Sequence, residues 1–196
     1  MNITERTPPR AVLALNVRRA RKHCTVSSQG RSAYLSLSWP GDCLGGLMAT
    51  FKRILVAIDF GDASGAALEL AVELAARCDS ELTLVHVWEF PSYEYLGGMP
   101  MPIDYADRLG EAARARMAGT INAIKSRCPN VKSIVRMGIA WSDVLGAAEE
   151  TKAELLVVGT HGRRGLKRAI LGSVAEKLVR LSPVPVLTVH SADKAA

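Results

Sequence analysis

From residue 54 to the end of the chain, short apolar runs alternate with stretches whose apolar residues recur at helical spacing. Ile54 to Ile58 form a continuous apolar run that ends at Asp59. Such runs are typical of strands buried on both faces. The next stretch has apolar residues at positions i, i+3, i+4 and i+7, namely Leu68, Ala71, Val72 and Ala75. This alternation predicts an open α/β sandwich, a mostly parallel sheet with helices on both faces.

Five strands and the helices between them follow from the same pattern. In open sheets of this kind, ligands bind beyond the carboxyl ends of the strands, where the winding reverses. The first helix is expected to be capped by Asp62 or Ser64. We predict strands at 54–58, 82–87, 131–137, 154–158 and 184–190, and further helices at 106–127, 142–152 and 173–180.

Residues 1–47 do not share this alternation. They contain Pro8-Pro9, clustered arginines and one short apolar run, Ala11 to Val17. Met48 stands just before the first predicted strand, and a chain beginning there has the length of one ordinary domain. We therefore predict a folded domain at 48–192 and interpret 1–47 as a basic leader that is disordered or not translated. A targeting peptide is the third interpretation, and a secretory signal fits least.

Charge, hydropathy and cysteine spacing exclude several classes of function. The formal charge is +6, but residues 1–50 carry seven basic and two acidic side chains and the remainder is nearly neutral. We therefore do not expect a nucleic-acid partner. No apolar run approaches the roughly 18 residues of a membrane helix. Cys24, Cys43, Cys78 and Cys128 lack zinc-site spacing, and their placement fits the reduced, passive thiols of a cytoplasmic protein better than a disulfide framework.

The segment after the fourth predicted strand has the composition of an anion site. Gly-Thr-His-Gly at 159–162 follows that strand, and Gly172-Ser173 opens the next helix. Glycine lets the backbone approach a phosphate, and helix-start N–H groups favour anions. Four basic residues lie between the two glycine pairs. The segment is neither a Walker A loop nor G-x-G-x-x-G. Two alternatives need no ligand: an ordinary turn, and a capping box from Ser173 to Glu176.

Taken together, these motifs resemble the universal stress protein family. The resemblance rests on Gly159-x-x-Gly162, nine residues, and then Gly172-Ser173, with Asp59 at the end of the first strand. It covers about residues 50–190. Trp141 stands where the family usually has proline, and the residues following Asp59 depart from the commoner acid-Gly-Ser pattern.

The resemblance implies a Rossmann-like nucleotide-binding fold, with a five-stranded sheet of order 3-2-1-4-5. The first and fourth strands then lie side by side at the switch point. The complete glycine set implies the ATP-binding branch of the family, with Mg²⁺ or Mn²⁺ as candidate metal ions. The implied contacts are Asp59 near the ribose or a metal, the Val87 backbone at the adenine, Gly159 at the ribose, and Gly162, Gly172, Ser173 and Val174 at the phosphates.

The sequence does not identify a nucleophile with a partner base and a group that orients the base, so we assign no catalytic residues. Our leading hypothesis is a cytoplasmic ATP-binding stress protein, a homodimer whose nucleotide state biases its interactions. The alternatives are a slow ATPase and a dimeric interaction module without nucleotide. The dimer is expected through the last strand, Val184 to His190, because a sheet edge needs cover and a second copy supplies it symmetrically.

Overall fold

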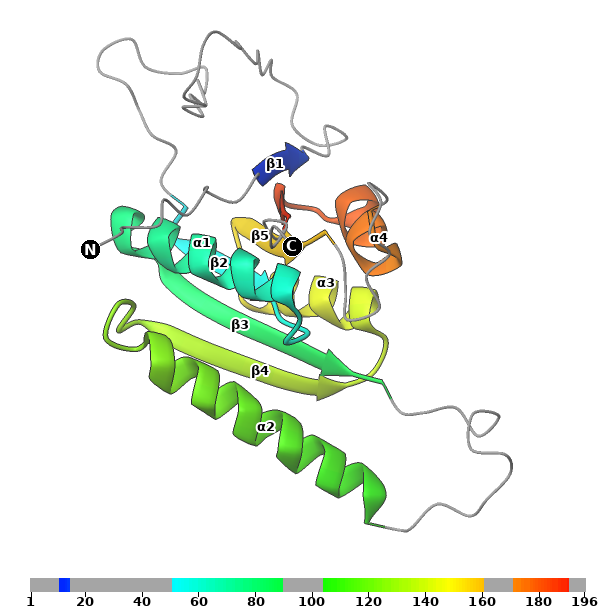
Figure 1. The fold of residues 1–196 in the computed structure, drawn as a ribbon. Helices are drawn as coiled ribbons and strands as arrows, with labels where there is room; N and C mark the ends of the chain where they lie inside the picture. The colour runs from blue at the N-terminus through cyan, green and yellow to red at the C-terminus, as the bar shows by residue number, and fades with distance from the viewer. Residues whose placement is uncertain (1–10, 15–50, 90–103, 161–170, 191–196) are drawn as a thin grey trace, which may run out of the picture.

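The computed structural model describes residues 11–14, 51–89, 104–160 and 171–190 (Figure 1). Strands β2 to β6 lie parallel in the order β4-β3-β2-β5-β6, which confirms the predicted order 3-2-1-4-5. A further strand, β1, pairs antiparallel with β6 at the edge of the sheet, and the sequence did not predict it. The strands are β1 (Ala11–Ala14), β2 (Arg53–Ala57), β3 (Glu81–Trp88), β4 (Val131–Met137), β5 (Leu155–Gly159) and β6 (Val186–Val189).

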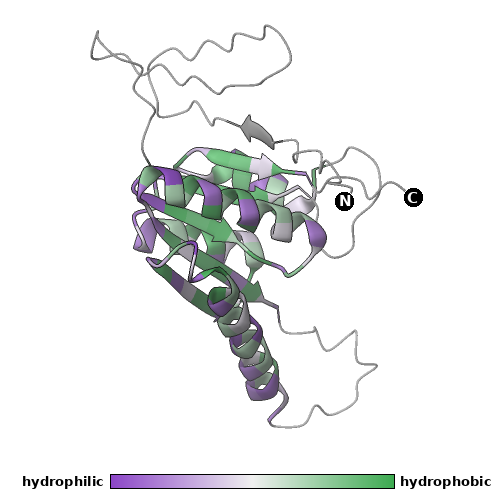
Figure 2. Ribbon diagram, turned by 60° about the vertical axis from the view of Figure 1, so that its left-hand side comes forward, coloured by the Kyte–Doolittle hydropathy of each residue, from purple (hydrophilic) through white to green (hydrophobic). Residues whose placement is uncertain are grey.

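Two helices cover each face of the sheet, because the strands alternate their apolar side chains between two cores. Ile54 and Val56 of β2 belong to the core that includes α1 and α2 residues, and Leu55 belongs to the core under α3 and α4. Figure 2 shows the sheet mostly in hydrophobic colours and hydrophilic residues along α2. The helices are α1 (Asp62–Cys78), α2 (Tyr105–Ile124), α3 (Ala140–Glu150) and α4 (Ser173–Leu181).

Several elements begin or end up to three residues from the predicted bounds: α2, for example, ends at Ile124 rather than at residue 127. Strand β6 begins at Val186 rather than Val184, since Pro185 has no N–H and takes part in the ladder only by accepting the Leu156 N–H through its carbonyl, at 3.0 Å. Helix α3 begins two residues before the predicted start. There the Asp143 carboxylate accepts the Ile139 N–H at 2.8 Å and so satisfies a donor at the helix start.

The predicted helix caps are wrong at both α1 and α4. Gly172 occupies the N-cap position of α4 and no side chain caps it, so Ser173 is the first helical residue and forms no capping box. Gly61 is likewise the N-cap of α1, before Asp62. Ser64 lies inside α1, where its hydroxyl donates to the Gly61 carbonyl at 3.0 Å.

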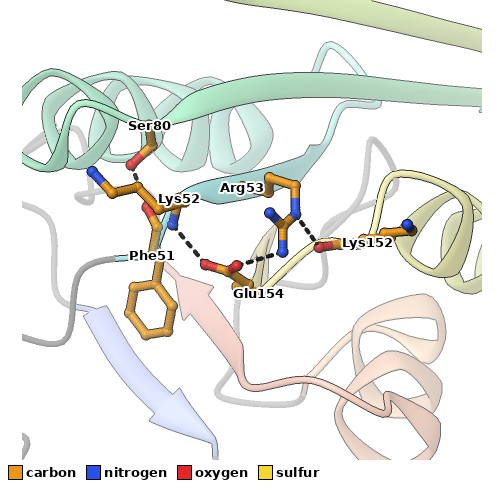
Figure 3. Close-up of polar contacts among 6 residues, drawn as sticks. All are labelled: Phe51, Lys52, Arg53, Ser80, Lys152 and Glu154. Atoms are coloured by element: carbon orange, nitrogen blue, oxygen red, sulfur yellow. Dashed lines mark hydrogen bonds and ion pairs between the residues drawn. The ribbon is translucent and has the colours of Figure 1, made fainter.

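Polar groups link β2 to β5 where both strands begin (Figure 3). The Glu154 carboxylate accepts the Lys52 backbone N–H at 2.6 Å and the Arg53 guanidinium at 2.5 Å. Arg53 also donates to the Lys152 carbonyl at 2.6 Å. These contacts fix the register of the two central strands at the end of the sheet opposite to the cavity described below.

Candidate functional site

The carboxyl ends of β2, β3 and β5 lie at the same end of the sheet, and β3 continues three residues beyond Val85, the partner of the last residue of β2. Ala57, the last residue of β2, pairs with Val85 of β3 on one side and Val158 of β5 on the other. The chain continues from β2 to β3 and β4 on one side, then crosses to β5 and β6 on the other. The space beyond these strand ends is therefore the topological switch point, where open α/β sheets bind ligands.

A cavity of about 880 Å³ occupies this position, which is within the usual size range of small-molecule sites. Gly162 lies outside the described residues, as do His161 and the four basic residues that follow it in the sequence. The cavity is lined by the other six residues implied by the family resemblance: Asp59, Val87, Gly159, Gly172, Ser173 and Val174.

Asp59 shapes the turn between β2 and α1 in addition to lining the cavity. One of its carboxylate oxygens accepts the Gly61 N–H at 2.9 Å, an arrangement typical of aspartate in tight turns. Between them, Phe60 has a φ of 62°, in the left-handed region. The turn thus directs the chain from β2 into α1 while it keeps Asp59 at the cavity.

Gly159 is needed for packing between β5 and α1. A Cβ at this position would lie 2.7 Å from the Ala63 carbonyl carbon and 2.8 Å from the Ser64 nitrogen. Both are backbone atoms, which cannot rotate away as a flexible side chain can. The first turn of α1 therefore approaches the end of β5 more closely than any residue with a side chain would permit.

The N-terminus of α4 supplies backbone donors to the cavity. The Gly172 N–H is already used, since it donates to the Thr160 carbonyl at 2.8 Å, and the Glu176 N–H donates to the Gly172 carbonyl at 2.8 Å. Helix geometry leaves the intervening N–H groups without an acceptor in the helix. They belong to Ser173, Val174 and Ala175, which all line the cavity.

Three further side chains, those of Phe60, His86 and Arg116, line the cavity on the side of α2, and spacing in the sequence did not reveal them. The Phe60 ring lies 4.6 Å from the His86 ring, centroid to centroid, and the Arg116 guanidinium lies 4.3 Å from the Phe60 centroid. His86 is buried, and its Nδ1 lies 2.6 Å from the Ile58 carbonyl oxygen. A polar residue within the apolar run 82–87 was the available signal for His86.

Among the described residues, no three His, Cys, Asp or Glu side chains are grouped closely enough to hold a metal ion. Within the same part of the chain, no helix is both long and apolar enough to cross a membrane.

Comparison with known proteins adds to this geometry. Residues 50–190 match the Universal stress protein family. The chain belongs to this family. Universal stress protein YxiE of Bacillus subtilis (strain 168) is 32% identical over 147 residues, which span 71% of this chain and 99% of that protein. Membership of the family supports a role in the response to stress.

Solved structures share the fold. Universal stress protein UspA from Lactobacillus plantarum aligns with a TM-score of 0.61 and 24% identity, over 72% of this chain and 99% of that one. A universal stress protein in complex with cAMP aligns with a TM-score of 0.50 and 24% identity, over 74% of this chain and all of that one (100%).

Proposed function

We propose that this chain binds ATP in the cavity at the switch point and acts in the cytoplasm as a nucleotide-dependent switch or adaptor in the stress response. One observation carries the proposal. The N–H groups that open α4, which have no acceptor in their helix, line a cavity of nucleotide size at the carboxyl ends of parallel strands. The positive end of the helix dipole favours a phosphate there.

The three parts of ATP would follow the order of the elements along the cavity. The phosphates would lie at the N-terminus of α4, with Ser173 and Val174 donating. The ribose would lie near Gly159 of β5 and Asp59 after β2, and the adenine near the Val87 backbone in β3. Gly172 differs from its neighbours because its N–H is engaged with Thr160, so we assign it close approach rather than donation. Gly162 remains a predicted phosphate contact.

A Mg²⁺ or Mn²⁺ ion would be held jointly by the nucleotide and the protein. Mg²⁺ is commonly bound by one or two carboxylates together with substrate phosphates, rather than by a cage made only of protein groups. Asp59 lines the cavity and can supply such a carboxylate oxygen. We therefore expect metal binding to depend on ATP.

Titration of the protein with ATP by calorimetry tests the proposal, with Gly172→Val as the decisive variant. Gly172 has φ −61° and ψ 152°, a backbone conformation that valine adopts without strain. We therefore expect the variant to fold and to lose ATP binding, because the new side chain stands at the start of α4.

Gly119→Val is the matched control. Gly119 lies in α2, and a Cβ there would meet no atom within 4 Å other than its chain neighbours and the backbone of its own helix. This variant should bind ATP like the parent, and circular dichroism should show that both variants are folded. A folded Gly172→Val protein with the ATP affinity of the parent would contradict the nucleotide proposal. Titration with cAMP in parallel establishes which nucleotide the cavity prefers.

Two other functions are separated by simple measurements. A slow ATPase would release phosphate in a steady-state assay, at a rate reduced by Ser173→Ala. A dimeric interaction module without nucleotide would carry none through purification, whereas we expect ATP in the denatured extract of the purified protein. We assign no catalytic residues to this chain.

We also propose that the chain forms a homodimer through β6. Strand β6 is the last of the parallel strands, with β5 paired to one of its edges and β1 to the other, and a second copy would take the place of β1. Pairing with β6 of a second copy would continue the sheet across a two-fold axis.

A further inference from the structure

Both edges of β6 are paired within a single chain. On one side, β6 pairs in parallel with β5, from Leu156 opposite Val186 to Gly159 opposite Val189. On the other side, β1 pairs antiparallel with β6, and each of the four residues of β6 has a partner in β1. In Figure 1, β1 lies at the edge of the sheet beyond β6. The edge that a second copy would need is thus occupied along its whole length.

A second copy would approach β6 with the same strand direction as β1. In an antiparallel pair, opposite residues exchange N–H···O bonds symmetrically, whereas the slanted bonds of a parallel pair treat the two strands differently. Two identical strands related by a two-fold axis therefore form hydrogen bonds in the antiparallel arrangement. Because β1 is also antiparallel to β6, the two partners compete for the same backbone groups.

We propose that β1 is an intramolecular cap that competes with a second copy of the chain for the edge of β6. The inference rests on the proposed dimer and adds its regulation. It also gives a role to Ala11–Ala14, part of the short apolar run within the predicted leader.

The competition depends on protein concentration. Because β1 belongs to the same chain as β6, its local concentration does not fall on dilution, whereas that of a second copy does. The capped monomer is therefore favoured in dilute protein, and any event that removes β1 from β6 promotes dimer formation.

The test replaces two residues of β1 in the full chain, Val12→Pro/Leu13→Pro. Successive residues of a strand direct their N–H groups to opposite edges, so one of these two residues donates toward β6, and proline removes that donor. The matched control is Val12→Thr/Leu13→Thr. It keeps both backbone N–H donors, and threonine is common in strands. Sedimentation velocity over a wide range of concentrations should give the proline variant a dimer dissociation constant at least about tenfold below that of the parent. The threonine control should behave like the parent.

The possible outcomes separate the cap from the dimer and from the nucleotide site. A parent chain as strongly dimeric as the proline variant would overturn the cap and leave the β6 dimer standing. A folded proline variant that stays monomeric at every concentration would overturn both. Adding Val186→Pro to the proline variant should restore the monomer, and a dimer that persists would place the interface elsewhere and overturn the cap. ATP titration of the same variants tests the nucleotide proposal independently, since β1 pairs with β6 at the edge of the sheet, away from the switch point between β2 and β5, and Val186 is not among the described residues that line the cavity.

Discussion

Gly159 lies where the end of β5 meets the first turn of α1. The atoms nearest to a Cβ at this position belong to the backbone of Ala63 and Ser64, at 2.7 to 2.9 Å. A larger residue must therefore displace α1, whose first residues follow the turn that carries Asp59. The geometry of the cavity and the packing of α1 therefore both depend on the absence of a side chain at Gly159.

Gly159→Ala should destabilise the protein by about 1–3 kcal/mol, the usual cost of forcing extra volume into a packed interior. Gly65→Ala is the control, because Gly65 lies in α1 and an added Cβ would meet no atom within 4 Å other than its chain neighbours and the backbone of its own helix. It should raise stability by about 0.5–1 kcal/mol through helix propensity. Urea unfolding of both variants measures the difference. A Gly159→Ala protein as stable as the parent would show that α1 moves freely on β5.

Ser173→Ala tests whether the Ser173 side chain caps the N-terminus of α4. Because Gly172 is the N-cap and no side chain caps the helix, the substitution should change stability by less than about 0.5 kcal/mol. A capping serine would cost about 0.5–2 kcal/mol when replaced by alanine. Thermal melting in the absence of nucleotide distinguishes the two values, and a loss in the upper part of the capping range would restore the capping box.

Among the elements, α1 is joined to the turn after α2 by a two-pronged ion pair. The Arg127 guanidinium donates to both carboxylate oxygens of Glu69, at 2.7 and 3.0 Å. The hydrogen bonds from Arg127 lower the pKa of Glu69 from its ordinary value of 4.5. A carboxylate with a lowered pKa stabilises the folded state above its unfolded pKa, and this contribution disappears as the pH falls through the folded pKa.

Glu69→Gln should therefore be less stable than the parent at pH 7, and the difference should vanish well below pH 4.5. Both side chains are about half exposed, so the loss at pH 7 should be small. Glu73→Gln is the control on the same helix, because its partner Arg77 lies 4.0 Å away. Denaturant unfolding at neutral and acid pH provides the measurement. If the stability difference between Glu69→Gln and the parent were the same at both pH values, the ion pair with Arg127 would not be its cause.

The elements also show which features a sequence can predict. The buried run at 54–58 and its successors identified the parallel strands, because their apolar character is local. The cap at Ser173 was wrong because proline, glycine and capping residues specify a helix start only to within a residue or two. Strand β1 was missed because a partner some 170 residues away along the chain leaves no trace in a local pattern.

The cavity shows the same distinction. Asp59 follows a strand and Gly172 precedes a helix, so their positions in the sequence predict that both lie at the carboxyl ends of the parallel strands. The contact among Phe60, His86 and Arg116 joins three elements far apart in the sequence, and no spacing rule connects them. Gly159 was predicted at the cavity, but its packing against α1 depends on tertiary contacts that only the structure reveals.

For the whole molecule, a chain that begins at Met48 tests the predicted boundary between the domain and the leader. The family match begins at residue 50 and YxiE is matched over 99% of its length, so we expect this shorter chain to fold. It lacks β1, which pairs with β6 at the edge of the sheet, away from the switch point between β2 and β5, and its ATP affinity should equal that of the full chain. A large loss of stability or of affinity would show that the folded domain begins before Met48.

The same shorter chain should differ from the full chain in how its melting temperature depends on concentration. Without β1 the edge of β6 is open, and a dimer that forms there is stabilised by mass action as concentration rises. The melting temperature of the shorter chain should therefore increase with protein concentration, whereas that of the capped full chain should stay nearly constant in dilute protein. Val186→Pro in the shorter chain removes a ladder donor from β6 and should abolish the increase. A melting temperature that is independent of concentration in the shorter chain would mean that β6 does not form the dimer, because no association would then be coupled to folding.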